Sequence, residues 1–242
     1  MVLLALVGAS TLLALGELRS AVPSQAARRL HAVAASGPEP VRSALSSWVS
    51  SNEGLITACP AGAVDAAIEL DVLHADLYVP FRQRDEWVRA LDRLERDARQ
   101  ALACQPTNGL VWARLAFASW FLGQPAARQA RYLDYSQLYA PAEMGALRAR
   151  FAQWARVTPI VVSDASASFD RDLRTVLSFG PASVTVAMLR DMPATSRAAI
   201  LEAARVLPPE RSDALRARGI DLHSTDPGAD GPTTASEAPP AR

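Results

Sequence analysis

Apolar side chains recur every three or four positions between residues 84 and 157, and prolines or glycines interrupt this spacing at short intervals. The spacing matches the turn of an α-helix, about 3.6 residues, so each segment would direct one apolar stripe toward a core. The interruptions fall at Pro106, Gly123, Pro125 and Pro141. Proline suits the first turn of a helix, and glycine suits the position after the last turn. The pattern therefore predicts four antiparallel helices on short loops, and an all-α fold.

The second of these helices is framed by residues typical of helix ends. Thr107 or Asn108 can cap its first turn, and Gly123 can end it. The helix before it, over residues 84–103, carries Arg and acidic residues four positions apart, opposite its apolar stripe. Such pairs each contribute little and solvate an outer face, so the apolar stripe decides how this helix packs.

The helix pair between Pro106 and Pro141 is similar to one tetratricopeptide repeat (TPR). The two prolines are 35 positions apart, close to the nominal repeat of about 34 residues. The positions that fit the tryptophan, leucine, small-residue, turn and proline positions of that repeat are Trp112, Leu115, Ala116, Gly123 and Pro141. The flanking segments do not repeat the pattern at a constant period. We therefore expect TPR-like helical hairpins and not a regular solenoid.

Composition divides the chain into five segments. We expect a signal-anchor or transmembrane helix over 1–20, a linker over 21–40, a TPR-like helical domain over 41–158, a small helical extension over 159–223 and a disordered tail over 224–242. The tail is rich in Pro, Gly, Ser and Thr and has no aromatic residue, which is typical of disorder.

The extension is expected to begin with a loop, because a short apolar run at 159–162 is followed at once by Ser and Asp. Shorter helices should follow, and Thr195 or Ser196 can cap the last one. These helices are expected over Arg171–Phe179, Ser183–Arg190 and Thr195–Val206, with a further polar helical turn near 208–219.

The N-terminus is apolar from the first residue, and Val2–Leu15 contains no charge. Fourteen helical residues cover only about 21 Å of a bilayer core of about 30 Å, so the run is short for a span. A secretory signal has an apolar centre of this length but should open with basic residues, which are missing here. Both observations fit a helix whose true start lies upstream. We expect a signal anchor that holds the chain in the lipid bilayer.

The side of the membrane is left open by two opposing features. Arg19, Arg28 and Arg29 follow the apolar run and favour a cytoplasmic domain. Cys59 and Cys104 each precede a proline at a helix boundary, and an even count of cysteines is compatible with a disulfide in an exported domain. Two buried free thiols fit the sequence equally well.

Charge and motifs exclude several functional classes. The 25 basic residues are all Arg and alternate with 25 acidic residues, so no one-sided basic patch for nucleic acid is expected. Asp71 and His74 share one helical face, but no further ligands accompany them, and we expect no metal site. The sequence has neither a nucleophile-elbow motif nor a phosphate-binding glycine loop. We expect a protein that is not an enzyme and needs no cofactor.

The segment from Ala101 to Trp154 resembles membrane-anchored accessory proteins of polysaccharide gene clusters, the VpsP-type proteins. Their pattern is a C-x-P, then a glycine and a helix tryptophan, then L-x-x-S, G-P-x-E and an arginine. Matching positions are Cys104, Pro106, Gly109, Trp112, Leu133, Ser136, Pro141, Glu143 and Arg150. The chain departs from the pattern at Ala140, where glycine is usual, and at Gly145, near an expected tryptophan.

The resemblance implies a single-pass protein of the inner membrane whose helical domain faces the periplasm. It would assist the assembly of exopolysaccharide or O-antigen as a non-enzymatic scaffold, through contacts with inner-membrane polysaccharide assembly proteins. Ser136, Glu143, Arg148 and Arg150 would form the docking patch. A second interpretation of Ser136 and Glu143 is helix capping and turn geometry. The alternative function is a structural subunit of another membrane-protein complex without a role in glycan assembly.

Overall fold

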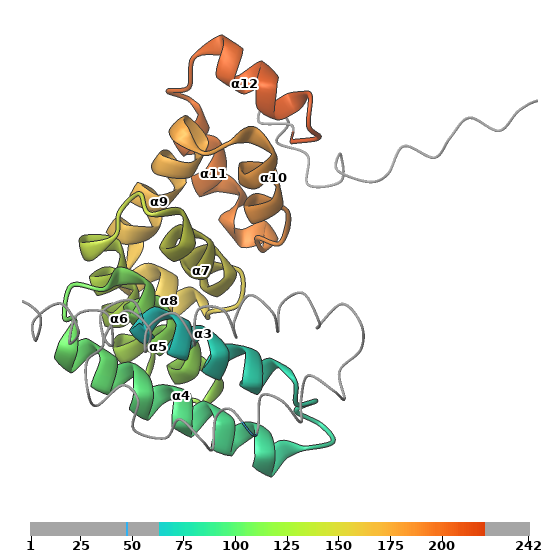
Figure 1. The fold of residues 1–242 in the computed structure, drawn as a ribbon. Helices are drawn as coiled ribbons and strands as arrows, with labels where there is room; N and C mark the ends of the chain where they lie inside the picture. Colours follow the sequence, from blue (N-terminus) through green and yellow to red (C-terminus); the bar gives the residue numbers. More distant parts are fainter. Residues whose placement is uncertain (1–46, 48–62, 221–242) are drawn as a thin grey trace, which may run out of the picture.

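The computed structural model describes residue 47 and residues 63–220. Within these residues the protein is all-α, with ten α-helices, one 3-10 turn and no strand (Figure 1). The elements are α3 (Ala63–Asp76), α4 (Arg84–Cys104), α5 (Gly109–Phe121), α6 (Ala126–Tyr139), α7 (Met144–Trp154), α8 (Pro159–Asp164), α9 (Ser166–Phe179), α10 (Ala182–Arg190), η2 (Ala194–Ser196), α11 (Arg197–Ala204) and α12 (Pro209–Arg216). The predicted fold class is confirmed at this level.

Successive helices lie side by side and form a stack. α3 packs on α4, α4 on α5 and α5 on α6, and α7 returns against α5. α8 and α9 pack on α6, and α11 and α12 continue the stack through α9 and α10. Figure 1 shows α3 and α4 at one end of the described chain and α12 at the other. One continuous apolar core runs through the stack from α3 to α12.

The ends of α5 form as the sequence predicts. The side chain of Asn108 accepts a hydrogen bond from the Val111 amide at 3.1 Å, which confirms Asn108 as the cap. Gly123 has φ of 66°. Two backbone bonds close this end, from Gly123 N to Trp120 O and from Gln124 N to Ser119 O. This is a Schellman motif, in which the left-handed position favours glycine.

Aromatic contacts join α5 to its two neighbours. Trp112 lies against Tyr132 and Tyr135 of α6, with ring centroids 5.7 and 4.7 Å apart. On the other side, Trp87 of α4 meets Phe121 edge-on at 5.2 Å. These rings fix how α5 sits between α4 and α6, because edge and tilted contacts between aromatic rings are geometrically selective.

Two predictions for the extension are wrong. The loop expected at the start of the extension is helical, because Pro159 occupies the first turn of α8 and Val161 is fully buried against the core. Neither Thr195 nor Ser196 caps a helix with its side chain. The 3-10 turn η2 joins directly to α11 there, so the backbone continues through the position where a cap would stand.

Several predicted segments lie outside the described residues. These are the membrane helix over 1–20, the linker over 21–40, the start of the helical domain up to residue 62 apart from residue 47, the last three residues of the extension, and the tail over 224–242. Among the described residues, no helix has both the length and the apolar character needed to cross a bilayer.

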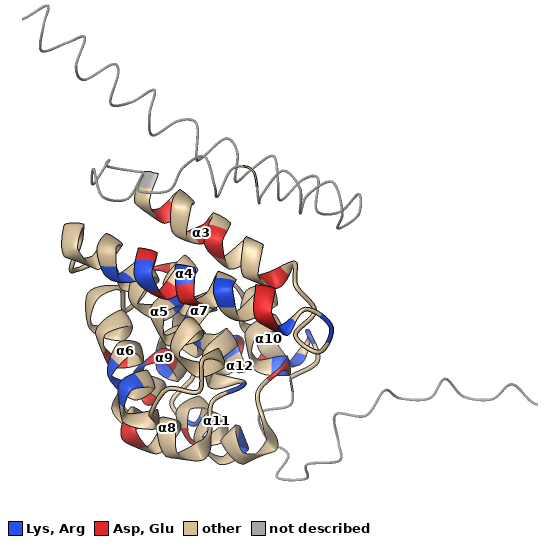
Figure 2. Cartoon of the chain, turned by 90° about the horizontal axis from the view of Figure 1, so that it is seen from below, with Lys and Arg blue, Asp and Glu red and all other residues tan. Residues whose placement is uncertain are grey.

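Charges of both signs interleave on the helices, and α3 is mainly acidic (Figure 2). Its acids meet arginines of the neighbouring helices. Glu69 pairs with Arg114 of α5 at 2.8 Å, and Asp71 pairs with Arg93 of α4 at 3.2 Å. These two acidic residues of α3 thus serve contacts between helices.

Candidate functional site

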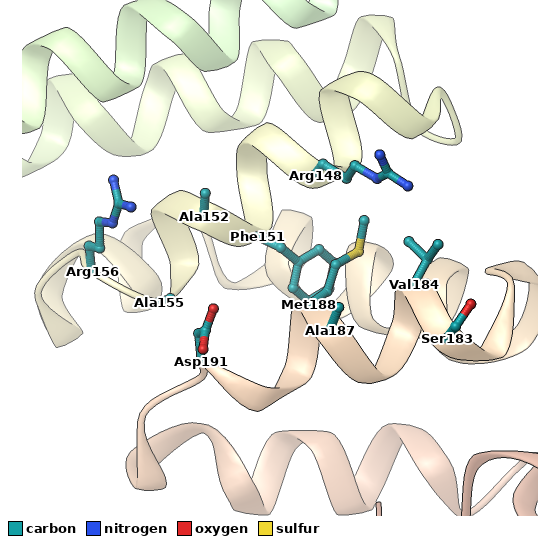
Figure 3. A pocket seen from close by; sticks show the side chains of 10 residues that line it. All are labelled: Arg148, Phe151, Ala152, Ala155, Arg156, Ser183, Val184, Ala187, Met188 and Asp191. Carbon is teal, nitrogen blue, oxygen red and sulfur yellow. The ribbon is translucent and has the colours of Figure 1, made fainter. Parts of the chain in front are cut away.

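An open groove of about 380 Å³ lies between α7 and α10 (Figure 3). Phe151 of α7 and Met188 of α10 lie at its centre, and Arg148 and Arg156 lie toward its two ends. The residues that complete the walls are small or short, namely Ala152, Ala155, Ser183, Val184, Ala187 and Asp191.

The groove combines an apolar floor with a mainly cationic rim. Arg148, Arg156 and Asp191 are all exposed, so two cations and one carboxylate stand at its edge. The guanidinium of Arg156 also lies 5.9 Å from the centre of the Phe121 ring, a distance typical of a cation–π contact. Small side chains in the walls let another chain approach closely. The groove is therefore suited to contact with an apolar segment that carries acidic groups.

A buried ion pair lies behind the groove, between Arg150 of α7 and Asp172 of α9. Both side chains are fully buried, and they form a bidentate pair with distances of 2.7 Å (Nε–Oδ2) and 2.8 Å (Nη2–Oδ1). Trp154 Nε1 donates a third hydrogen bond to the carboxylate at 2.9 Å. Burial raises the pKa of Asp172, and the hydrogen bonds from Arg150 and Trp154 oppose that rise.

The remaining donors of Arg150 join the same network to α6. Its Nη1 donates to the carbonyl and the hydroxyl of Ser136 and to the Ala140 carbonyl, each at 3.1 Å. Ser136 in turn donates to the Gly109 carbonyl at the start of α5, at 2.7 Å. The planar fork of donors lets Arg150 join α7 to α6 and α9, and the Ser136 hydroxyl extends the network to α5.

Gly109 is required by the close approach of α5 and α6. A Cβ atom there would collide with the Cβ of Ala140 and would lie only 2.8 Å from the Ser136 carbonyl oxygen. Three of the positions that carry the expected resemblance, Gly109, Ser136 and Arg150, therefore meet at one junction. Trp112 donates to the Pro106 carbonyl at 2.8 Å there, and Leu133 is fully buried.

The structure places the four predicted contact residues in two different settings. Ser136 and Arg150 are fully buried, so neither can touch a partner, and the predicted docking patch is corrected at these positions. Glu143 is exposed and caps α7, accepting from the amides of Gly145 at 2.9 Å and Ala146 at 3.2 Å. The capping interpretation of Glu143 is confirmed. Arg148 is exposed on the groove, and its contact with a partner stays a prediction.

A second buried carboxylate lies between α3 and α4. Asp71 faces Arg93 and Asp97, and burial together with the Asp97 charge raises its pKa to about 8. His74 lies on the same helix, and its Nε2 is 3.0 Å from the hydroxyl of Tyr78, which follows the end of α3. Burial lowers the pKa of His74. The two polar residues that the sequence places on one face are thus engaged in separate contacts, with Arg93 and with Tyr78.

Cys104 takes part in a disulfide. Cys59, the partner expected from the sequence, lies outside the described residues, so the pairing of these two cysteines stays a prediction.

Sequence reasoning missed Asp172 and the role of Arg150. The signal was present, because both residues fall on the apolar stripe of their helices. Asp172 stands among Phe169, Leu173 and Val176, and Arg150 stands among Leu147, Phe151 and Trp154. A charge at such a position is buried and needs a partner of opposite sign. Sequence alone does not tell which helix supplies that partner.

Comparison with protein-family models, with curated proteins and with solved structures gives no match for this chain. The resemblance to VpsP-type proteins therefore stays a prediction from the motif residues.

Proposed function

We propose that the chain is a non-enzymatic, membrane-anchored helical scaffold that assists surface-polysaccharide biosynthesis or export through protein–protein contacts. The observation that supports it most directly is the groove between α7 and α10. Its apolar floor and two exposed arginines fit an amphipathic helix with acidic residues along one edge. The partner we propose is such a segment of an inner-membrane polysaccharide assembly protein.

The helical architecture supports the scaffold interpretation. α4, α5, α6 and α7 are consecutive antiparallel helices on short loops, and α5 with α6 is the pair between Pro106 and Pro141, so this segment fits the arrangement of TPR-like hairpins. Such hairpins present elongated surfaces to partner peptides. The charged groups inside the stack are occupied by one another, as in the pair of Arg150 and Asp172, and so are engaged in holding helices together.

The membrane anchor and the periplasmic location rest on sequence alone, on the apolar run Val2–Leu15 and on the resemblance. Labelling of the cysteines with a membrane-impermeant thiol reagent tests the location. Labelling in outer-membrane-permeabilised cells only after reduction would support a periplasmic domain. Labelling that requires lysis of the inner membrane, and no reductant, would contradict it.

The docking proposal is tested by photo-cross-linking in living cells. A photoreactive amino acid replaces Ala187, which lines the groove, or Ala127, an exposed alanine on α6 that serves as the control position. We expect a cross-link to a polysaccharide assembly protein from position 187 only. The double substitution Arg148→Glu and Arg156→Glu should reduce this cross-link, since it reverses the charge of the rim.

Two outcomes would overturn the function. A cross-link from position 187 to a respiratory or secretion complex, with unchanged surface polysaccharide in a deletion strain, would favour the alternative of a structural subunit elsewhere. Equal cross-linking from positions 187 and 127 would remove the groove as the contact surface. Surface polysaccharide should fall in the deletion strain and recover with the wild-type chain.

A further inference from the structure

A second pocket, of about 490 Å³, lies where α10, α11 and the end of α12 meet. Its apolar surface includes Leu189, Met192 and Ile200. Three arginines also line it, namely Arg190 at the end of α10, Arg197 at the start of α11 and Arg218 just beyond α12. The volume falls within the range of about 300–1,000 Å³ that is usual for small-molecule sites.

The described residues that line this pocket carry charges of one sign. No acidic residue is among the described residues that line it, and the nearby Asp191 belongs to the groove between α7 and α10 instead. Arg190 and Arg218 are both exposed at the mouth, and the described salt bridges include neither of them. Two exposed guanidinium groups, with no acidic residue among the described residues of the lining, favour an anionic ligand.

The end of α12 is shaped to bring two of the lining residues together. Gly219 has φ of 93°, a left-handed conformation that other residues rarely adopt. The backbone bonds from Gly219 N to Arg216 O and from Ile220 N to Leu215 O complete a Schellman motif. The turn thereby places Arg218 on one side of the glycine and Ile220 on the other, and both line the pocket.

We propose that this pocket binds an anionic amphiphile, a molecule with a phosphate or carboxylate head and an alkyl or isoprenoid chain. The head would pair with Arg190 and Arg218, and the chain would lie against the partly exposed side chains of Met192 and Ile220. A free phosphate would leave the apolar surface unused. A nucleotide would need a ring to stack on, and no aromatic residue is among the described residues that line the pocket.

Photoaffinity labelling of the full-length chain in phosphatidylcholine nanodiscs tests this site. The probe is a decyl phosphate with a diazirine in its chain, and labelled peptides are mapped by mass spectrometry. We expect labelling between residues 182 and 220 that excess decyl phosphate suppresses. Neither decanol nor inorganic phosphate should suppress it at the same concentration, since each carries only half of the recognised chemistry.

Variants separate the arginines of the pocket from charge in general. The double substitution Arg190→Ala and Arg218→Ala should weaken the apparent affinity by at least about tenfold, the loss typical of a charge-assisted hydrogen bond to an anion. Its matched control is Arg96→Ala with Arg174→Ala, two exposed arginines on α4 and α9, and it should leave the affinity unchanged. Circular dichroism establishes that both double variants fold.

A third variant tests the apolar side of the pocket. Ile220→Ser keeps every arginine and removes apolar surface at the mouth, so it should also weaken labelling. An equal loss of apparent affinity in the two double variants would overturn the proposal. Suppression of photolabelling by decanol alone would overturn it as well. Suppression by inorganic phosphate alone would replace the amphiphile with a free anion. Each of these results is independent of cross-linking at the α7–α10 groove, so this site and the proposed scaffold function can fail separately.

Discussion

Replacing Arg150 by methionine should lower the stability of the protein more than any change on the surface. The substitution removes two hydrogen bonds to Asp172 and three to α6, and it leaves a fully buried carboxylate whose remaining hydrogen-bond donor among the described residues is the Trp154 indole. Breaking a buried ion pair by removal of one partner costs about 3–5 kcal/mol. With a slope of about 2 kcal/mol per molar urea, the unfolding midpoint would fall by about 1.5–2.5 M.

A double-mutant cycle shows whether the pair itself is responsible. Asp172→Asn alone should cost a similar amount, because it leaves the Arg150 charge buried without a counter-charge. The double variant Arg150→Met with Asp172→Asn contains neither charge, so its loss should fall short of the sum of the single losses by at least about 2 kcal/mol. Urea unfolding followed by far-ultraviolet circular dichroism measures all four proteins.

Arg148→Met is the matched control, since it removes the same side chain two positions earlier on the exposed side of α7. It should change stability by less than about 0.5 kcal/mol. The reasoning is refuted if Arg150→Met costs under about 1 kcal/mol, or if the two single losses add in the double variant.

Three further changes test other parts of the fold by the same assay. In the folded state Asp71 keeps its proton up to about pH 8, whereas in the unfolded state it loses the proton near pH 3.8. The free energy of unfolding should therefore fall as the pH rises from about 5 to 8. Asp71→Asn should flatten this fall, and an unchanged slope would show that another group causes it. Gly109→Ala should cost about 1–3 kcal/mol, because its Cβ meets Ala140. Adding Ala140→Gly should recover part of that loss, and no recovery would locate the clash elsewhere. Glu143→Ala should cost about 1 kcal/mol through the lost cap of α7, and Glu143→Gln should cost less. Equal losses in these two variants would argue against the capping contact.

The sequence was sufficient for those helices whose ends carry a local signal. α4 and α5 begin and end near the predicted residues because the apolar stripe, the Asn108 cap and the left-handed Gly123 each act within one or two turns. It was insufficient for α8, where the short apolar run gives no helical period and burial of Val161 against the core decides the conformation. Tertiary contacts override weak local preference in such segments.

In the candidate site, too, local properties could be predicted from the sequence, and contacts between distant helices could not. The exposure of Arg148 and the cap by Glu143 follow from their positions on α7, which are local properties. The partner of Arg150 is 22 positions away on another helix, so spacing along the chain could not identify it. The pKa of Asp71 likewise depends on Asp97 and Arg93, which only the packing of α3 on α4 brings near.

Because Arg150 is buried, it cannot contact a partner itself, but it can still affect docking through the orientation of α7. Arg148 and Arg150 are two positions apart on α7, about 200° around the helix, so one points to the groove while the other points to α6 and α9. A bidentate pair accepts only a narrow range of orientations, so Arg150 and Asp172 fix the rotation of α7 about its own axis. That rotation decides which side chains reach the rim of the groove. Substitutions at Ser136 or Arg150 should therefore impair stability and docking together, whereas substitution of Arg148 should impair docking alone.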